Sequence, residues 1–183
     1  AALAGKADAM RKRHRDLMER QKAAAALGWE ASPVTTARLA AEVWNAIKDE
    51  KWCLAVSDRI AWPKRLWPTS QFHHMLGSSG AQGVGYAAPR AVGAALANKK
   101  YGRFSVSIES DGDLMMNPGS LWTAAHHRIP VLFVMHNNRA YHMQTQHILR
   151  VSLRHGRGTE NCKIGTALDD PNINYAKLAE SLG

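Results

Sequence analysis

The chain has 183 residues, a net charge of +9 at neutral pH, 45% apolar residues and 21% charged residues. This length and composition are typical of a globular domain with its own core, and the absence of a run of about 18 apolar residues excludes a membrane-spanning helix. The N-terminus lacks a signal-peptide core, and Cys53 and Cys162 have no metal-like spacing, so we expect reduced thiols in a cytoplasmic protein.

Residues 1–30 form a basic segment that we expect to be a helical linker or the end of a preceding domain. Residues 2–26 are rich in good helix formers, and Gly28 and Pro33 predict where the helix ends. The positive charge would suit a nucleic acid, but the segment has no interleaved aromatic residues and no nucleic-acid motif. We therefore interpret it as a solvated helix face and do not expect nucleic acid as a partner.

The main domain is expected at residues 31–183, where apolar runs at 52–58, 103–110 and 131–136 predict strands. A helix capped by Thr35 or Thr36 precedes the first strand, and the prolines of "WPKRLWP" after it predict a loop. The stretch "GSSGAQGVGYAAPRAVGAALANKK" predicts a glycine-rich turn and then a helix of small residues.

Three further helices are predicted in the second half of the chain. One has Pro118 in its first turn and ends near Arg128, and the others lie in "YHMQTQHILRVSL" and "DPNINYAKLAESLG". The alternation of strands and helices predicts an α/β fold with a parallel sheet flanked by helices. Because such a unit usually returns to the sheet after its last helix, we expect the domain to be incomplete at its C-terminus.

Polar residues follow two of the predicted strands. Asp111, in an expected Asp-Gly-Asp turn, follows the strand 103–110, and Asn138 follows the strand 131–136. A right-handed crossover would bring both to the edge where parallel sheets bind ligands. Carboxylate and amide oxygens suit Mg²⁺, and Gly112 would let the backbone approach a diphosphate. Asp-Gly turns and Asn-Asn loops are also common without a ligand, so both interpretations stay open at this point.

The stretch from Ser110-Asp111-Gly112 to Asn137-Asn138 resembles the thiamin-diphosphate-binding motif, Gly-Asp-Gly followed after a gap by Asn-Asn. The blocks "LGSSGAQGVGYAAPRAVGAALAN", "SLWTAAHHRIPVLFVMHNNRAYH" and "DDPNINYAKLAESLG" are similar to the acetolactate-synthase-like branch of these enzymes. The resemblance covers residues 31–183 and implies a truncated pyrophosphate-binding (PP) domain. The enzyme would form or cleave C–C bonds next to a carbonyl.

The resemblance implies a role for each matching position. The Mg²⁺ ligands would be Asp111, the side chain of Asn138 and the backbone carbonyl of Ala140. The residues that would contact thiamin diphosphate are Ser57, Asp58, Val84, Gly112, Asp113, Leu114, Asn138, Ala140, Tyr141 and Met143. The residues beside the reacting carbon, or able to relay protons to it, would be Gln144, His142 and His74.

Two positions depart from the family's motif. Ser110 replaces its first glycine, and Asp113 stands where a small or hydroxylated residue is usual. A second carboxylate beside a diphosphate is repulsive unless a cation faces it, so Asp113 could instead hold the ion's water shell. Both departures could also mark a non-catalytic diphosphate-binding module.

The resemblance further implies partners. The substrate would be a 2-oxo acid or a 2-hydroxyacyl compound, and acetolactate formation and 2-hydroxyacyl-CoA cleavage stay open as alternatives. In an expected homodimer or homotetramer, the pyrimidine-binding domain of another subunit would supply the glutamate that activates the cofactor. We therefore expect the 183-residue chain alone to bind the cofactor weakly and not to turn over.

Overall fold

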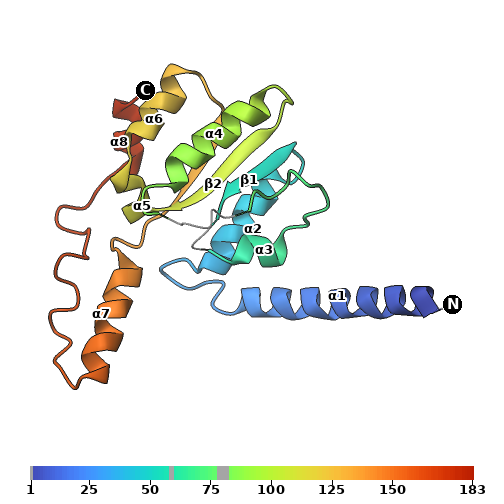
Figure 1. Ribbon diagram of the computed structural model, residues 1–183, viewed down its shortest axis with the longest axis horizontal. Coiled ribbons are helices and arrows are strands. Elements are labelled where there is room, and N and C mark those ends of the chain that lie inside the picture. Colours follow the sequence, from blue (N-terminus) through green and yellow to red (C-terminus); the bar gives the residue numbers. More distant parts are fainter. Residues whose placement is uncertain (1, 58–59, 78–82) are drawn as a thin grey trace. The chain divides into compact units, whose positions relative to one another are not determined.

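The computed structural model describes residues 2–57, 60–77 and 83–183, and the chain divides into two compact units. Unit 1 contains Ala1–Glu50 and Ile60–His74, and unit 2 contains Lys51–Arg59 and Met75–Gly183. The sheet, whose strands are drawn as arrows in Figure 1, belongs to unit 2. In the part of the chain that is described, no helix combines the length and the apolar character that a membrane span needs.

Unit 1 contains three helices among its described residues: α1 (Ala2–Ala26), α2 (Thr36–Ile47) and α3 (Trp62–Leu66). The predicted end of the first helix is confirmed, since Gly28 follows it with a φ of +67°. The predicted cap is confirmed as well, because the Thr35 hydroxyl accepts a hydrogen bond from the backbone N–H of Arg38 at 3.1 Å.

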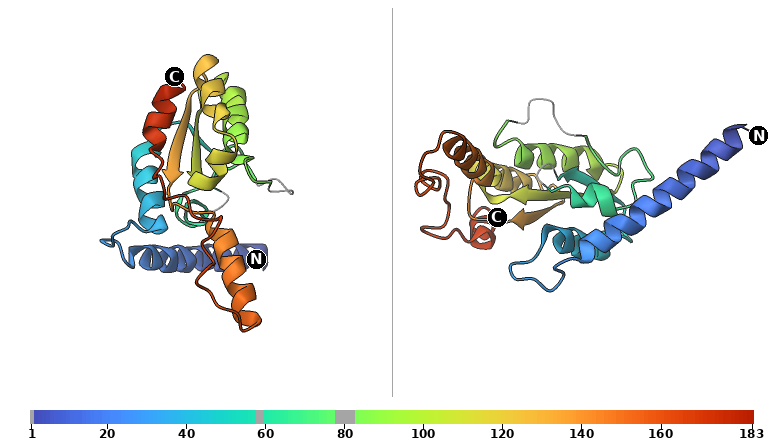
Figure 2. Two further views of the ribbon diagram at one scale, coloured as in Figure 1. Left: turned by 90° about the vertical axis from the view of Figure 1, so that its left-hand side faces the viewer. Right: turned by 90° about the horizontal axis from the view of Figure 1, so that it is seen from below.

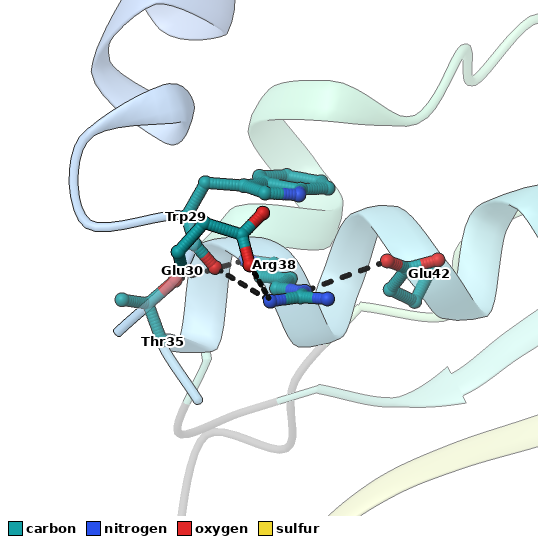
Figure 3. A network of polar contacts seen from close by, with 5 residues as sticks. All are labelled: Trp29, Glu30, Thr35, Arg38 and Glu42. Carbon is teal, nitrogen blue, oxygen red and sulfur yellow. Dashed lines mark hydrogen bonds and ion pairs between the residues drawn. The ribbon is translucent and has the colours of Figure 1, made fainter. Parts of the chain in front are cut away.

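Arg38 ties the chain before α2 to that helix (Figure 3). Its guanidinium donates to the carbonyl of Trp29 at 2.8 Å and lies 5.5 Å from the centre of the Trp29 ring. The same group forms ion pairs with Glu30 at 3.4 Å and Glu42 at 3.5 Å. One planar cation thus fixes the turn between α1 and α2 from several sides.

The loop predicted for "WPKRLWP" is wrong, because Trp62–Leu66 forms the short helix α3. Pro63 lies in the first turn of this helix. A backbone N–H at that position would have no hydrogen-bond partner within the helix, and the fixed φ of proline already suits a helix. Trp67 follows α3 and anchors it, because the indole N–H donates to the carbonyl of Ala40 at 2.8 Å.

Unit 2 contains a sheet of three parallel strands in the order β1-β2-β3: β1 (Trp52–Val56), β2 (Phe104–Ser110) and β3 (Val131–His136). The predicted parallel α/β sheet flanked by helices is therefore confirmed. β2 is central and almost wholly buried, whereas β3 is only half-buried because it is an edge strand of the described sheet.

The helices of unit 2 are α4 (Ala87–Lys99), α5 (Asp111–Met116), α6 (Gly119–His126), α7 (His142–Arg154) and α8 (Tyr175–Ser181). α4 lies along β2 through small residues, and its Ala88, Ala91 and Ala95 are fully buried. Asn98 near its end donates to the hydroxyl of Ser105 on β2 at 3.1 Å. α7, by contrast, has no buried residue and extends away from the sheet (Figures 1 and 2).

The segment after β2 differs from the expected turn, because Asp111–Met116 is the helix α5. The chain is extended at Ser110 and turns helical at Asp111, which places two carboxylates in the first turn of α5. Acidic side chains there interact favourably with the helix dipole, and this favours a helix over a turn.

Candidate functional site

The carboxyl ends of β2 and β3 lie side by side, since Ser110 pairs with His136 in the parallel register. A cavity of about 220 Å³ opens at this edge of the sheet. Its lining residues are Val84, Ser110, Gly112, Asp113, His136, Asn138, Ala140, Tyr141, His142, Met143 and Gln144. They come from the turn before α4, the two strand ends, α5, the segment between β3 and α7, and the first turn of α7. The structure therefore brings together most of the residues that the sequence analysis predicted as site residues.

Asp111 does not line the cavity, because its side chain is fully buried at the start of α5. Neither of its carboxylate oxygens has a hydrogen-bond partner among the described residues. A buried carboxylate without a partner is costly, so such groups are usually paired or coordinate a metal. The two oxygens are therefore available to a cation.

The amide oxygens of the Asn-Asn pair shape the turn after β3. Asn137 Oδ1 accepts from the backbone N–H of Arg139 at 3.2 Å, and Asn138 Oδ1 accepts from that of Ala140 at 3.1 Å. An amide oxygen has two lone pairs, so the Asn138 oxygen can still bind an ion. Two backbone hydrogen bonds flank Ala140: the Tyr141 N–H donates to the Thr166 carbonyl, and the Leu168 N–H donates to the Arg139 carbonyl. Neither of them uses the Ala140 carbonyl.

These oxygens fit a hard divalent cation. Within the described ranges, no cluster of three or more His, Cys, Asp or Glu side chains could hold a metal. A cation at this edge would instead use one carboxylate, one amide oxygen and one backbone carbonyl, which is a ligand set that suits Mg²⁺ and leaves positions for phosphate oxygens and water.

Gly112 lies directly against an aromatic ring. A Cβ atom at this position would come within 2.7 Å of two ring carbons of Tyr141. The glycine is therefore required by the approach of Tyr141, in addition to any requirement from a bound anion.

Gly112→Ala is expected to reduce the free energy of unfolding by about 1–3 kcal/mol, because overpacking forces the Tyr141 ring to move. Denaturant unfolding measures this change. Gly119→Ala is the matched control, since nothing lies within 4 Å of its Cβ position, and it should change stability by less than about 1 kcal/mol. In a Tyr141→Ala background the Gly112→Ala penalty should vanish, and an unchanged penalty there would contradict the steric explanation.

The two departures from the motif have structural explanations. Ser110 has φ of −83° and ψ of 146°, a conformation that any residue adopts, so no glycine is needed. The Asp113 carboxylate accepts from the backbone N–H groups of Gly85 at 2.8 Å and Ala87 at 3.0 Å. Its charge is thus directed at the beginning of α4.

Sequence reasoning missed Glu109, which is 1% exposed on β2. Burial, and after it the nearby Asp113 charge, raise its pKa to about 8, against the opposing effect of hydrogen bonds from Ser107 and the Ala88 N–H. Period-2 alternation places it on the same side of β2 as Ser105 and Ser107. That alternation groups Glu109 with polar residues and so favours an exposed face, which means that the sequence carried no signal for its burial.

Two other titratable groups lie near Asp111. Burial lowers the pKa of His136, against an opposing effect of the Asp111 carboxylate. Burial, and after it the charges of Asp111 and Tyr141, raise the pKa of Tyr175 to about 12. His136 was also missed as a lining residue, although its position next to Asn137 at the end of β3 was a usable signal.

The other residues that the sequence analysis predicted for the site do not all line the cavity. His142, Met143 and Gln144 line the cavity from α7, and Val84 lines it from the turn before α4. Leu114 is buried in a core cluster with Ala88 and Tyr175. Ser57 is buried directly after β1 and is not a lining residue. Asp58 lies outside the described residues, and His74 belongs to unit 1.

Comparison with known proteins gives one family match. The family described as "Thiamine pyrophosphate enzyme, C-terminal TPP binding domain" matches residues 57–183. The acetolactate synthase of Bacillus subtilis (strain 168) is 26% identical over 156 residues, which are 85% of this chain and 25% of that protein. The benzoylformate decarboxylase of Pseudomonas aeruginosa is 30% identical over 103 residues, which are 56% of this chain and 17% of that protein.

Among solved structures, the thiamine diphosphate-dependent 4-hydroxybenzoylformate decarboxylase of Rhodococcus jostii RHA1 has a similar fold. The TM-score is 0.64 at 24% identity, and the match covers 82% of this chain and 26% of that chain. The chain thus spans a quarter or less of the length of the two curated relatives. The family match and the curated relatives confirm the resemblance found in the sequence, and the solved structure confirms the fold.

Proposed function

Since the chain belongs to the thiamine pyrophosphate enzyme family through the C-terminal TPP-binding domain, we propose that it binds thiamin diphosphate and Mg²⁺. It would do so as part of an enzyme that forms or cleaves a C–C bond next to a carbonyl group. The observation that carries this proposal is the buried Asp111 carboxylate, whose oxygens lack partners in the described chain at the edge where the cavity opens. Such a group needs a cation, and a diphosphate would supply that cation's remaining ligands.

The residues of this chain would hold, orient and shield the cofactor. Asp111, Asn138 and the Ala140 carbonyl would bind Mg²⁺, and the backbone of Gly112 would line the diphosphate. When bound, thiamin diphosphate supplies an electron sink next to the substrate's carbonyl carbon. His142 and Gln144, at the rim formed by α7, would position a proton near that carbon.

We propose a 2-oxo acid as the substrate, because one relative is named for the decarboxylation of benzoylformate, which is a 2-oxo acid. The pyrimidine-binding domain of another subunit would supply the activating glutamate, in a homodimer or homotetramer. Both cysteines are free and buried, which supports a reducing compartment such as the cytoplasm.

A non-catalytic diphosphate-binding module is the second candidate, and Ser110 and Asp113 were the two reasons for it. Ser110 has an ordinary backbone conformation, and Asp113 accepts two hydrogen bonds. Both residues are therefore compatible with an intact site. These observations favour the enzyme.

Calorimetric titration of thiamin diphosphate into the full-length protein tests the proposal. Binding should be at least about tenfold tighter with Mg²⁺ than with a chelator, because the cation joins the diphosphate to Asp111. An affinity that does not respond to Mg²⁺ would contradict the proposed site. Turnover of 2-oxo acids by the loaded protein separates the enzyme from the non-catalytic module.

A further inference from the structure

Asp113 forms an unusual link between two helices. It lies in the first turn of α5, and its carboxylate accepts from Gly85 through one oxygen and from Ala87 through the other. Tyr86, the N-cap residue of α4, makes no side-chain capping bond of its own. The first N–H group of α4 and one N–H group of the turn before it are therefore bound by a residue that is distant in sequence.

A second contact holds the same turn against α5. Gly85 has a φ of +81°, and a Cβ atom at this position would lie only 2.8 Å from the Cβ of Met116. The turn is thus fixed to the beginning of α5 by hydrogen bonds and to its end by close packing.

Val84 precedes this glycine and lines the cavity. Its side chain is 51% exposed and cannot form hydrogen bonds, so its position depends on the backbone of the turn. Gly112 and Asp113 line the same cavity from α5. A shift of the turn relative to α5 would therefore change the width of the cavity.

We propose that Asp113 is a positioning residue that ties the Val84 turn to α5 and so holds Val84 at the distance the bound cofactor requires. This inference rests on the proposed function. The side chain of Asp113 acts here through Val84 and not as a ligand of the cation or its water shell.

The chemistry of the carboxylate explains why this position is an aspartate. Two N–H donors converge on it, and a carboxylate offers an acceptor oxygen to each. An asparagine would turn its NH₂ group toward one of the donors, and a serine would offer only one oxygen. The negative charge also interacts favourably with the N-terminus of α4.

The first experiment does not depend on the cofactor. Hydrogen exchange of the Gly85 and Ala87 amides in the cofactor-free full-length protein should become at least about tenfold faster in Asp113→Ala. Asp113→Asn, which retains one acceptor and disturbs the fold less, should release one amide more than the other. The central β2 amides should keep their protection and so report that the variants are folded. Unchanged exchange at Gly85 and Ala87 would overturn the proposal.

The second experiment is a double-mutant cycle with Val84, read as the dissociation constant of thiamin diphosphate at saturating Mg²⁺. Asp113→Ala should weaken binding by about tenfold when Val84 is present, and by less than about twofold in a Val84→Ala background, because Asp113 acts through Val84. An equal loss in both backgrounds would show that Asp113 contacts the cofactor directly or acts through overall stability, and would overturn the proposal.

A control separates this inference from the proposed function. Asp49→Asn removes a carboxylate from an exposed residue of unit 1 and should leave both measurements unchanged. If the wild-type protein bound no thiamin diphosphate, the proposed function would fail, while the amide-exchange result would still decide whether Asp113 holds the turn.

Discussion

Asp111→Asn is expected to lower the affinity of the full-length protein for thiamin diphosphate in Mg²⁺ by at least about 100-fold, because the variant loses the only carboxylate in the proposed ligand set. The same change should stabilise the metal-free protein by about 1–3 kcal/mol, because it removes a buried charge whose oxygens have no partner in the described residues. Calorimetric titration measures the first effect, and denaturant unfolding in a chelator measures the second.

The opposite signs of these two effects make the test specific. A purely structural aspartate would lose stability when it is replaced, whereas a ligand-binding aspartate loses function and gains stability. Asp49→Asn, at an exposed position, should alter neither quantity by more than about 0.5 kcal/mol. If Asp111→Asn destabilised the metal-free protein and left Mg²⁺-dependent binding intact, the assignment of Asp111 as a cation ligand would be wrong.

The features that the sequence predicted well depend on local rules. Thr35 or Thr36 was expected as a helix cap, and Thr35 is the cap because its hydroxyl needs only the N–H of Arg38, three residues away. The expectation that the two strand ends meet at one edge, where Ser110 pairs with His136, followed from a general property of parallel strands joined by a right-handed crossover. In both cases the spacing along the chain determines the geometry.

The errors arose where the position of a residue within an element mattered more than its type. The prolines of "WPKRLWP" suggested a loop, but Pro63 in the first turn of α3 is compatible with a helix. Asp111 and Gly112 suggested a turn, but acidic residues also favour the first turn of a helix, and they begin α5.

The contact between Asp113 and Gly85 could not be predicted from the sequence at all. The two residues are 28 positions apart, and no periodicity links the turn before α4 to the helix after β2. The same holds for the ring of Tyr141 against Gly112, which depends on how α7 leaves the end of β3. Such contacts follow from the packed fold, so the composition of the cavity was predictable while the links that hold it together were not.

The wild-type protein without metal is expected to lose on the order of 4 kcal/mol of stability relative to Glu109→Gln as the pH rises from about 5 to about 8. The cause is the pKa of Glu109, which burial and the nearby Asp113 charge raise from 4.5 to about 8. Between these values the folded state holds a proton that the unfolded state has released, so the free energy of unfolding falls as the pH increases. Glutamine keeps the shape and the hydrogen-bonding capacity of the protonated acid, so the variant lacks this loss.

Urea unfolding at a series of pH values, with a chelator present, measures the effect. Burial lowers the pKa of His136, which makes stability rise with pH and so opposes the Glu109 effect. That contribution is common to both proteins and cancels in the difference between them. Glu180→Gln, at an exposed position of α8, should follow the wild-type curve. Parallel curves for the wild type and Glu109→Gln would show that the carboxylate is already charged at neutral pH, and that the cations or dipoles around it outweigh the cost of its burial.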